Sequence, residues 1–272
     1  MRGYAVIVAI LGAGKMGELV LGGLLRGGHP VTDAIATARR PERAEQLRAA
    51  HGVRVFNNAT AAGQADVLVI GVKPQDADAL LREIAPNMRR GALVVSLCAG
   101  LPTEFFARRL PEGTPVVRVM TNTPALVGGA ISAISPGAHA TEAHVARAEE
   151  LFRPLGAVIR VPEKQQDAVT AVSGSGPAYI YLFVESMIEA GVLLGLPRAT
   201  AHELAVQTAL GSATMLRDSG EHPAVLRAAV TSPAGTTAAA LHQLERHGMR
   251  AAVLDALEAA RDRAVALAAQ NT

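Results

Sequence analysis

A short glycine-rich stretch near the start of the chain has the spacing of a phosphate-binding turn. Residues 12–17 read Gly-Ala-Gly-Lys-Met-Gly, directly after the apolar run 5–11 and before the amphipathic run 18–26. When G-x-G-x-x-G lies between a strand and a helix, its first glycine permits a tight turn, its second allows a pyrophosphate to approach the backbone, and its third lets the helix pack on the strand. The start of the helix supplies free N–H groups for the phosphate. The pattern predicts a dinucleotide site formed by Gly12, Ala13, Gly14, Lys15, Met16 and Gly17.

The residues after the second predicted strand bear on which dinucleotide is bound. NAD-binding domains usually carry an acidic residue there, about 20 residues past the glycines, which accepts hydrogen bonds from the ribose. Thr37 and Ala38 occupy that place, and Arg39 and Arg40 follow. Guanidinium groups pair with a 2′-phosphate through charge-assisted hydrogen bonds, although two solvated arginines before a helix are the alternative. We therefore expect NADP as cofactor, with NADPH preferred and NADH as an alternative reductant.

Three further segments follow predicted strands, at the edge of the sheet where open α/β proteins bind ligands. These segments are residues 72–74, 98–100 and 120–124. Cys98 has no histidine nearby in sequence to activate it, so it is better suited to a pocket wall than to a nucleophile. The cofactor-binding residues predicted here are Val72, Lys73, Pro74, Ala99, Gly100, Asn122, Thr123 and Pro124.

Two hydroxyl-rich stretches in the second half of the chain each precede a predicted helix. They are Ser-Gly-Ser-Gly-Pro at 173–177 and Thr-Ser-Pro-Ala-Gly-Thr-Thr at 231–237. Unpaired N–H groups and the helix dipole at such a start favour a carboxylate, although N-capping by Ser and Thr is the plain alternative. Two such stretches after a nucleotide-binding pattern favour a substrate site.

The order of predicted elements indicates how these residues are positioned. Short apolar strands alternate with helices up to residue 162, which predicts right-handed β-α-β crossovers and a parallel sheet. Beyond residue 162 no convincing strand follows, and helices dominate, with a short turn at 223–229 and a break near Gly248. We predict an α/β fold: a Rossmann-type doubly wound parallel sheet over residues 1–162, and an all-helical C-terminal domain over residues 163–272.

Composition excludes several classes of function. The formal net charge is +2 and no basic tract or aromatic platform occurs, which argues against nucleic acid as a partner. Cys98 is the only cysteine, so no internal disulfide forms and a reducing compartment is expected. The most apolar run, 179–196, is interrupted by Glu185 and Glu189, which argues against a membrane span. We expect a cytoplasmic protein with no metal site.

The same run bears on oligomeric state. Residues 179–194 are apolar nearly all round, and a helix of that kind needs burial on every side. The helices of a single chain, about a hundred residues in all, offer too little surface to bury this helix on every side. The helices of a partner chain would bury it. The sequence therefore predicts a dimer or larger assembly.

At the two hydroxyl-rich stretches the chain resembles a known family. Residues 167–179 and 226–241 are similar to the matching segments of the pyrroline-5-carboxylate reductase family, and the motifs at 12–17, 72–74 and 120–124 match in order and spacing. The resemblance implies reduction of 1-pyrroline-5-carboxylate to L-proline with NADPH or NADH, the last step of proline biosynthesis. It also implies a homodimer assembled into a larger ring. Ala234 departs from the family, which usually has the first of two glycines there.

The resemblance further implies residue roles. Backbone amides around Ser232, Gly235 and Thr236 would hold the substrate carboxylate, Thr237 would act as the catalytic residue beside the ring nitrogen, and Asn58 would contact the adenosine ribose. Because a cyclic imine arrives partly protonated, a strong general acid is dispensable and positioning should dominate. The implied substrate-binding residues are Ser173, Ser175, Val230, Ser232, Gly235, Thr236 and Thr237.

Two alternatives remain at this point. A β-hydroxyacid dehydrogenase shares the two-domain layout and uses a catalytic Lys followed by Asn one helical turn later. Lys164 is the sole lysine of the helical half and Ala168 lies four residues on, so that pair of residues is missing. A non-catalytic NADP-sensing module would explain the glycine turn and leave the hydroxyl-rich stretches as helix caps. Consumption of NADPH with pyrroline-5-carboxylate distinguishes these alternatives.

Overall fold

The computed structural model describes residues 6–271, which form two compact units. The first unit contains the chain up to Ser175 together with the residues from Ala260 onward, and the second contains Gly176–Ala259. The boundary expected from the sequence, between residues 162 and 163, lies inside the first unit. This difference arises because the segment after residue 163 bonds to the sheet, where Gln166 donates to the carbonyl of Ala133 at 3.1 Å.

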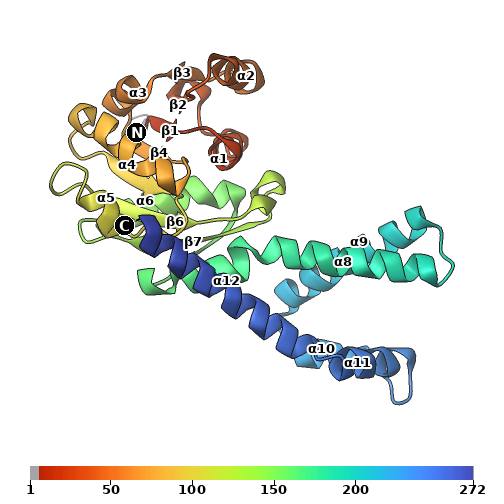
Figure 1. Ribbon diagram of the computed structural model, residues 1–272. Helices are drawn as coiled ribbons and strands as arrows, with labels where there is room; N and C mark the ends of the chain where they lie inside the picture. The colour runs from red at the N-terminus through yellow and green to blue at the C-terminus, as the bar shows by residue number, and fades with distance from the viewer. Residues whose placement is uncertain (1–5, 272) are drawn as a thin grey trace. The chain divides into compact units, whose positions relative to one another are not determined.

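An eight-stranded sheet forms the centre of the first unit, in the order β3-β2-β1-β4-β5-β6-β7-β8 (Figure 1). All neighbouring strands are parallel except β6 and β7. The strands are β1 (Val8–Leu11), β2 (Ala34–Thr37), β3 (Arg54–Phe56), β4 (Val67–Ile70), β5 (Leu93–Ser96), β6 (Val116–Met120), β7 (Ala130–Pro136) and β8 (Gly156–Arg160).

Helices cover both faces of this sheet, which confirms the doubly wound fold. Side chains in a strand alternate between faces, so Val8 and Ile10 of β1 enter one apolar core while Ala9 and Leu11 enter the other. Residues of α1, α2 and α6 build the first core, and residues of α3, α4 and α5 build the second. These helices are α1 (Lys15–Arg26), α2 (Pro41–His51), α3 (Asn58–Gln64), α4 (Pro74–Ile84), α5 (Thr103–Ala107) and α6 (Glu142–Phe152).

The antiparallel direction of β7 departs from the parallel sheet expected from the sequence. Only the 3₁₀ turn η3 (Thr123–Val127) separates Met120, at the end of β6, from Ala130, at the start of β7. A parallel return needs a crossover of about a dozen residues or more. The short connection therefore brings the chain back antiparallel, next to β6.

The second unit is helical. It contains α8 (Gly176–Leu193), α9 (Arg198–Ser219), α10 (Pro223–Ala229), α11 (Thr236–Arg246) and the first part of α12 (Met249–Asn271). α8 and α9 pack side by side as a hairpin (Figure 1), with Gly191 close to Ala201. Residues 223–229, expected as a turn, form α10 because Pro223 suits a first helical position. Among the described helices, none combines the length and apolar character of a membrane span.

Candidate functional site

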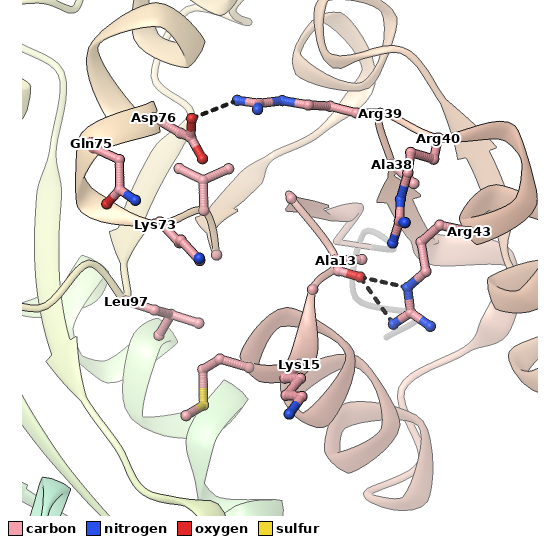
Figure 2. A pocket seen from close by; sticks show the side chains of 15 residues that line it. Ala13, Lys15, Ala38, Arg39, Arg40, Arg43, Lys73, Gln75, Asp76 and Leu97 are labelled. Atoms are coloured by element: carbon pink, nitrogen blue, oxygen red, sulfur yellow. Dashed lines mark hydrogen bonds and ion pairs between the residues drawn. The ribbon is translucent and has the colours of Figure 1, made fainter.

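The glycine turn lines a cavity of about 740 Å³ at the carboxyl ends of β1, β2, β4 and β5. Figure 2 shows Arg40 and Arg43 on one side of it and Lys73 and Gln75 on the other. A smaller cavity of about 250 Å³ adjoins it and includes Asn58. The larger cavity is lined by Gly12, Ala13, Gly14, Lys15, Met16, Ala38, Arg39, Arg40, Arg43, Gly71, Val72, Lys73, Gln75, Asp76 and Leu97.

The three glycines of the turn have different surroundings. Gly12 has a φ of +79°, and a Cβ there would lie 2.3 Å from Cγ1 of Val72. A Cβ on Gly17 would lie 2.8 Å from the carbonyl oxygen of Gly12, so both positions require glycine. A Cβ on Gly14 would meet nothing within 4 Å. Gly14 therefore borders open space where a pyrophosphate could approach the backbone, as the G-x-G-x-x-G pattern predicts.

Thr37 takes a structural role at the position where NAD-binding domains carry their acid. Its hydroxyl accepts a hydrogen bond from the N–H of Gly12 at 3.0 Å, and its carbonyl accepts one from Ala13 at 3.0 Å. Thr37 is buried and also lines the smaller cavity. The end of β2 thus fixes the glycine turn.

Three arginines follow β2, and each has different partners. Arg39 forms an ion pair with Asp76 at 3.1 Å (Figure 2). Arg43, which the sequence analysis missed, donates to the carbonyl of Ala13 at 3.1 Å and pairs with Glu18. The side chain of Arg40 lines the cavity and makes no hydrogen bond or ion pair with another described residue.

Arg43 connects the starts of α1 and α2. Its hydrogen bond holds the pKa of the Glu18 carboxyl below the ordinary value, and His51 contacts the same carboxyl at 3.1 Å. The Glu18 carboxylate thus keeps the Arg43 guanidinium beside the glycine turn. The sequence signal for Arg43 is its place in the first turn of the helix that follows β2.

Several expected cofactor residues lie outside the two cavities. Pro74 begins α4, and Gly100 has a φ of +78° beside the backbone of Ala268. Asn122 donates to the carbonyl of Ser173 at 3.0 Å and accepts from the N–H of Ile131 at 3.3 Å, so its amide holds backbone in place. The expected residues that line neither cavity are Gly17, Pro74, Ala99, Gly100, Asn122, Thr123 and Pro124.

Cys98 is unsuited to nucleophilic chemistry. Its side chain is buried, and burial raises the pKa of its thiol to about 12. The Sγ donates to the carbonyl of Val72 at 3.4 Å. A thiol with that pKa remains protonated at neutral pH and provides no thiolate.

The two serines of the first hydroxyl-rich stretch lie at the end of the first unit's main segment. Between β8 and α8 the chain forms α7 (Gln166–Val169) and a turn of π-helix, η6 (Thr170–Gly174). Ser173 lies in this π-turn, where its hydroxyl donates to the carbonyl of Val169 at 3.0 Å, and Ser175 follows directly. This π-turn was not predicted from the sequence, and such turns are often found at functional sites.

The second hydroxyl-rich stretch belongs to the second unit, between α10 and α11. Gly235 is the N-cap of α11, and a Cβ there would lie 2.4 Å from the Oγ of Ser232. Thr236 and Thr237 are the first two residues of α11, and no side chain caps this helix. Its first N–H groups therefore lack intrahelical partners. Val230, at the end of α10, is exposed.

Comparisons with known proteins place the chain in a family. Residues 163–267 match the family model described as pyrroline-5-carboxylate reductase dimerisation, and residues 7–100 match that of NADP oxidoreductases dependent on coenzyme F420. Pyrroline-5-carboxylate reductase of Mycobacterium tuberculosis (strain H37Rv) is 43% identical, with 94% of this chain and 95% of that protein covered. The chain belongs to the pyrroline-5-carboxylate reductase family.

Other members of the pyrroline-5-carboxylate reductase family agree along nearly the whole length. The Escherichia coli reductase is 37% identical over 92% of this chain and 94% of its own. The solved Coxiella burnetii reductase has a TM-score of 0.89 at 33% identity, covering 96% and 97% of the two chains. The Plasmodium falciparum reductase, solved with NADP bound, has a TM-score of 0.88 at 29% identity, covering 97% and 98%.

Ala234, the departure from the usual pyrroline-5-carboxylate reductase pattern, has a strained backbone. Its φ of 57° makes it the only described residue other than glycine with a positive φ. An alanine in this left-handed region carries a cost of about 1–2 kcal/mol, which explains why glycine suits the position.

Ala234→Gly is expected to raise the free energy of unfolding by about 1 kcal/mol, because relief of strain exceeds the added entropy of the unfolded glycine. Urea unfolding at fixed protein concentration measures the change. Ala238→Gly, inside α11, is the matched control and should lower stability by about 1 kcal/mol. A loss of stability in both variants would show that Ala234 is not strained.

Proposed function

We propose that this protein reduces 1-pyrroline-5-carboxylate to L-proline with NAD(P)H. The observation that carries the proposal is its membership of the pyrroline-5-carboxylate reductase family, with 43% identity over 94% of the chain. The cavity at the glycine turn supports the binding of a dinucleotide. We further propose that residues 1–162 bind the cofactor, and that residues 163–272 bind the substrate and form the dimer.

The residues around the cavity fit a dinucleotide in three ways. The turn at Gly14 has open space beside its backbone, and α1 begins directly after it. Arg39 and Arg40 lie at the end of β2, where the ribose of a dinucleotide usually lies. Val72 and Leu97, after β4 and β5, offer an apolar wall. A bound cofactor would supply the hydride, these residues would orient it, and Asn58, which lines the smaller cavity, would contact the ribose.

The loop before α11 supplies groups suited to the substrate. We assign the substrate carboxylate to the backbone amides around Ser232, Gly235 and Thr236, because the start of α11 leaves N–H groups free. The Thr237 hydroxyl then hydrogen-bonds the ring nitrogen as the neighbouring carbon accepts the hydride. We also propose Ser173, Ser175 and Val230 as substrate-binding residues.

We also propose that the protein is a cytoplasmic homodimer assembled into a larger ring. No residue of α8 is buried within the chain. Large apolar side chains such as Ile180 and Leu182 are 59% and 64% exposed. An exposed apolar helix of this kind supports a subunit interface.

An assay of NADPH consumption with 1-pyrroline-5-carboxylate tests the activity directly. We expect the absorbance of NADPH to fall only when the imine is present, with L-proline formed in equal amount. A panel of β-hydroxy acids with NADP serves as the control for the dehydrogenase alternative and should give no reduced cofactor. Tight NADPH binding without turnover of any of these compounds would favour the sensing module instead.

The preference for NADPH has its own test. Arg39→Ala combined with Arg40→Ala should raise the Michaelis constant for NADPH by about tenfold and change that for NADH little. A hydrogen bond to a charged group contributes about 1.5–3 kcal/mol, and we expect the lower value because Arg39 is 69% exposed and thus screened by solvent. Steady-state kinetics with each cofactor measures both constants.

Asp76→Asn is the companion variant in that experiment. The Asp76 carboxylate lies 3.1 Å from the Arg39 guanidinium and therefore competes with a 2′-phosphate for it. Neutralising the carboxylate should lower the Michaelis constant for NADPH while leaving that for NADH unchanged. Equal effects on both cofactors, in the arginine or the aspartate variant, would rule out a role in phosphate recognition.

A further inference from the structure

A row of buried polar residues crosses the sheet beneath the segment that carries Ser173. Arg118 lies in the middle of β6, where it pairs with Ser96 of β5 on one side and with Ser135 of β7 on the other. All three residues are buried, and Arg118 is only 6% exposed. A buried guanidinium in a central strand is costly unless its charge is paired.

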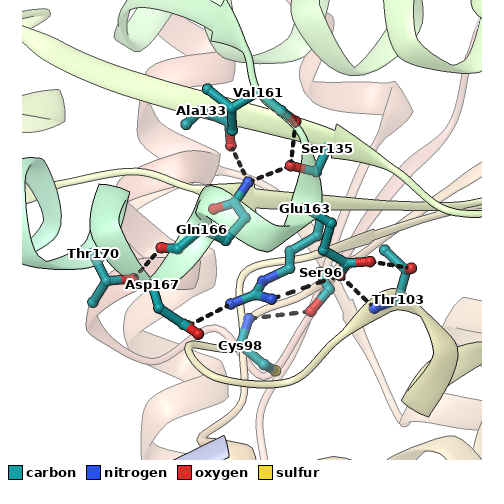
Figure 3. A network of polar contacts seen from close by, with 11 residues as sticks. Ser96, Cys98, Thr103, Ala133, Ser135, Val161, Glu163, Gln166, Asp167 and Thr170 are labelled. Carbon is teal, nitrogen blue, oxygen red and sulfur yellow. Dashed lines mark hydrogen bonds and ion pairs between the residues drawn. The ribbon is translucent and has the colours of Figure 1, made fainter. Parts of the chain in front are cut away.

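The partners of Arg118 come from the segment between β8 and α8. The carboxylates of Glu163 and Asp167, both labelled in Figure 3, each form an ion pair with the Arg118 guanidinium. The Oε1 of Glu163 lies 3.6 Å from Nη1 of Arg118, and the Oδ1 of Asp167 lies 3.5 Å from Nη2. Arg118 thus contacts this segment at Glu163, three residues before α7 begins, and again at Asp167 inside α7.

Further hydrogen bonds of Gln166 and Glu163 strengthen the attachment of this segment to the first unit. Gln166 is fully buried and donates to the Oγ of Ser135 at 2.8 Å as well as to the carbonyl of Ala133. Glu163 accepts from both the N–H and the hydroxyl of Thr103, each at 2.7 Å, which joins it to the start of α5. The beginning of the segment is therefore fixed to β6, β7 and α5 at once.

The far end of the segment is attached to the end of β6. The hydroxyl of Thr170 donates to the carbonyl of Gln166 at 2.8 Å at the start of the π-turn, and the carbonyl of Ser173 accepts from Asn122 at 3.0 Å. Gly174 lies against Met120, the last residue of β6. Asn122, in the loop after β6, thus holds the far end of the π-turn, while Thr170 joins its start to α7, which Arg118 of β6 contacts at Asp167.

We propose that Arg118 is a positioning residue, which through Glu163 and Asp167 sets the π-turn at 170–174 and hence the placement of Ser173 and Ser175 for the substrate. The inference rests on the proposed function, because it takes these two serines as substrate-binding residues. The Arg118 side chain itself is buried beneath the segment and touches neither cavity lining at the glycine turn. Loss of the Arg118 contacts should therefore weaken binding of the substrate and leave binding of the cofactor unchanged.

Asp167→Asn is the variant of choice, since it keeps the shape of the side chain and removes the charge that faces Nη2 of Arg118. We expect the Michaelis constant for 1-pyrroline-5-carboxylate to rise roughly tenfold, because displaced serines at 173 and 175 bind the substrate less well. The turnover number should stay nearly unchanged. The dissociation constant of NADPH should stay within about twofold of the wild-type value. Hydrogen exchange of peptides covering residues 163–175 should become faster.

Two further variants make the test specific. Arg118→Lys keeps the charge but loses the planar fork that reaches both carboxylates, so it should raise the same Michaelis constant. Glu149→Gln is the matched control, because Glu149 pairs with Arg160 in the same unit but outside this segment. That variant should retain the wild-type Michaelis constant for the imine and the wild-type exchange of residues 163–175.

Three results would overturn the inference. One is an unchanged Michaelis constant for the imine in Asp167→Asn and Arg118→Lys. Another is an equal weakening of imine and NADPH binding. A third is a lower thermal midpoint with wild-type kinetics, which would assign the network to stability alone. If the wild-type protein itself fails to reduce the imine, the proposed function is wrong, and unchanged exchange of residues 163–175 in Asp167→Asn would then still reject the positioning role.

Discussion

Ile180→Arg is expected to convert the protein from an assembly into monomers at micromolar concentration. Ile180 lies on α8, is 59% exposed within the chain, and lines a groove of about 520 Å³ between α8 and α9 with Tyr181 and Val184. Burying a guanidinium without a partner costs several kcal/mol, and a symmetric interface contains the substitution twice. A penalty of about 4 kcal/mol already weakens association about a thousandfold.

Sedimentation velocity or light scattering measures the mass of the variant. Ala49→Arg, on the exposed side of α2 in the first unit, adds the same charge to a different helix and should leave the mass unchanged. A wild-type protein that is monomeric at micromolar concentration and retains activity would contradict the proposal that α8 forms the interface. An Ile180→Arg variant of unchanged mass would place the interface elsewhere on the chain.

The parts of the fold that follow from local pattern could be predicted from the sequence. The alternation of short apolar strands with amphipathic helices predicted the doubly wound sheet, because the central strands bury both faces and each covering helix buries one. The glycine turn was predictable for a similar reason: Gly12 has a positive φ directly after a strand, and Gly17 packs against the carbonyl of Gly12, five residues earlier. These features need no knowledge of distant residues.

Features that depend on distant partners could not be predicted in this way. Arg43 points back to Ala13, and Asn122 bonds to Ser173, 51 residues later. On the sequence alone, the Arg43 side chain could equally have been solvated, and the Asn122 amide could equally have faced a cofactor. Their roles are set by which strands lie side by side, which no single stretch of sequence encodes.

The position of Ala234 shows a limit of a different kind. The motif at 231–237 was recognisable, but the consequence of alanine depends on the backbone angle, and the left-handed φ of 57° appears only in the structure. The π-turn at 170–174 is similar, because hydroxyl-rich residues before a helix are equally typical of a simple N-cap. In both cases the sequence identified the segment and the structure supplied its conformation.

Thr237→Ala is expected to lower kcat/KM for 1-pyrroline-5-carboxylate by about ten- to a hundredfold, which corresponds to about 1.5–3 kcal/mol for a hydrogen bond to a charged iminium. Thr237 is the second residue of α11, directly after the free amides proposed to hold the carboxylate. The substitution removes the hydroxyl and leaves those amides, so the dissociation constant of NADPH should not change. Stopped-flow binding and steady-state kinetics measure the two quantities separately.

The division of the loss in kcat/KM between the turnover number and the Michaelis constant shows at which stage of the reaction the Thr237 hydroxyl acts. A hydrogen bond that strengthens as the hydride is transferred lowers the turnover number when it is lost, whereas one that serves ground and transition states equally raises only the Michaelis constant. Thr237→Ser keeps the hydroxyl and should retain much of the activity. If Thr237→Ala and Thr237→Ser both behave like the wild type, Thr237 only begins the helix, and hydride transfer depends on positioning by the backbone amides alone.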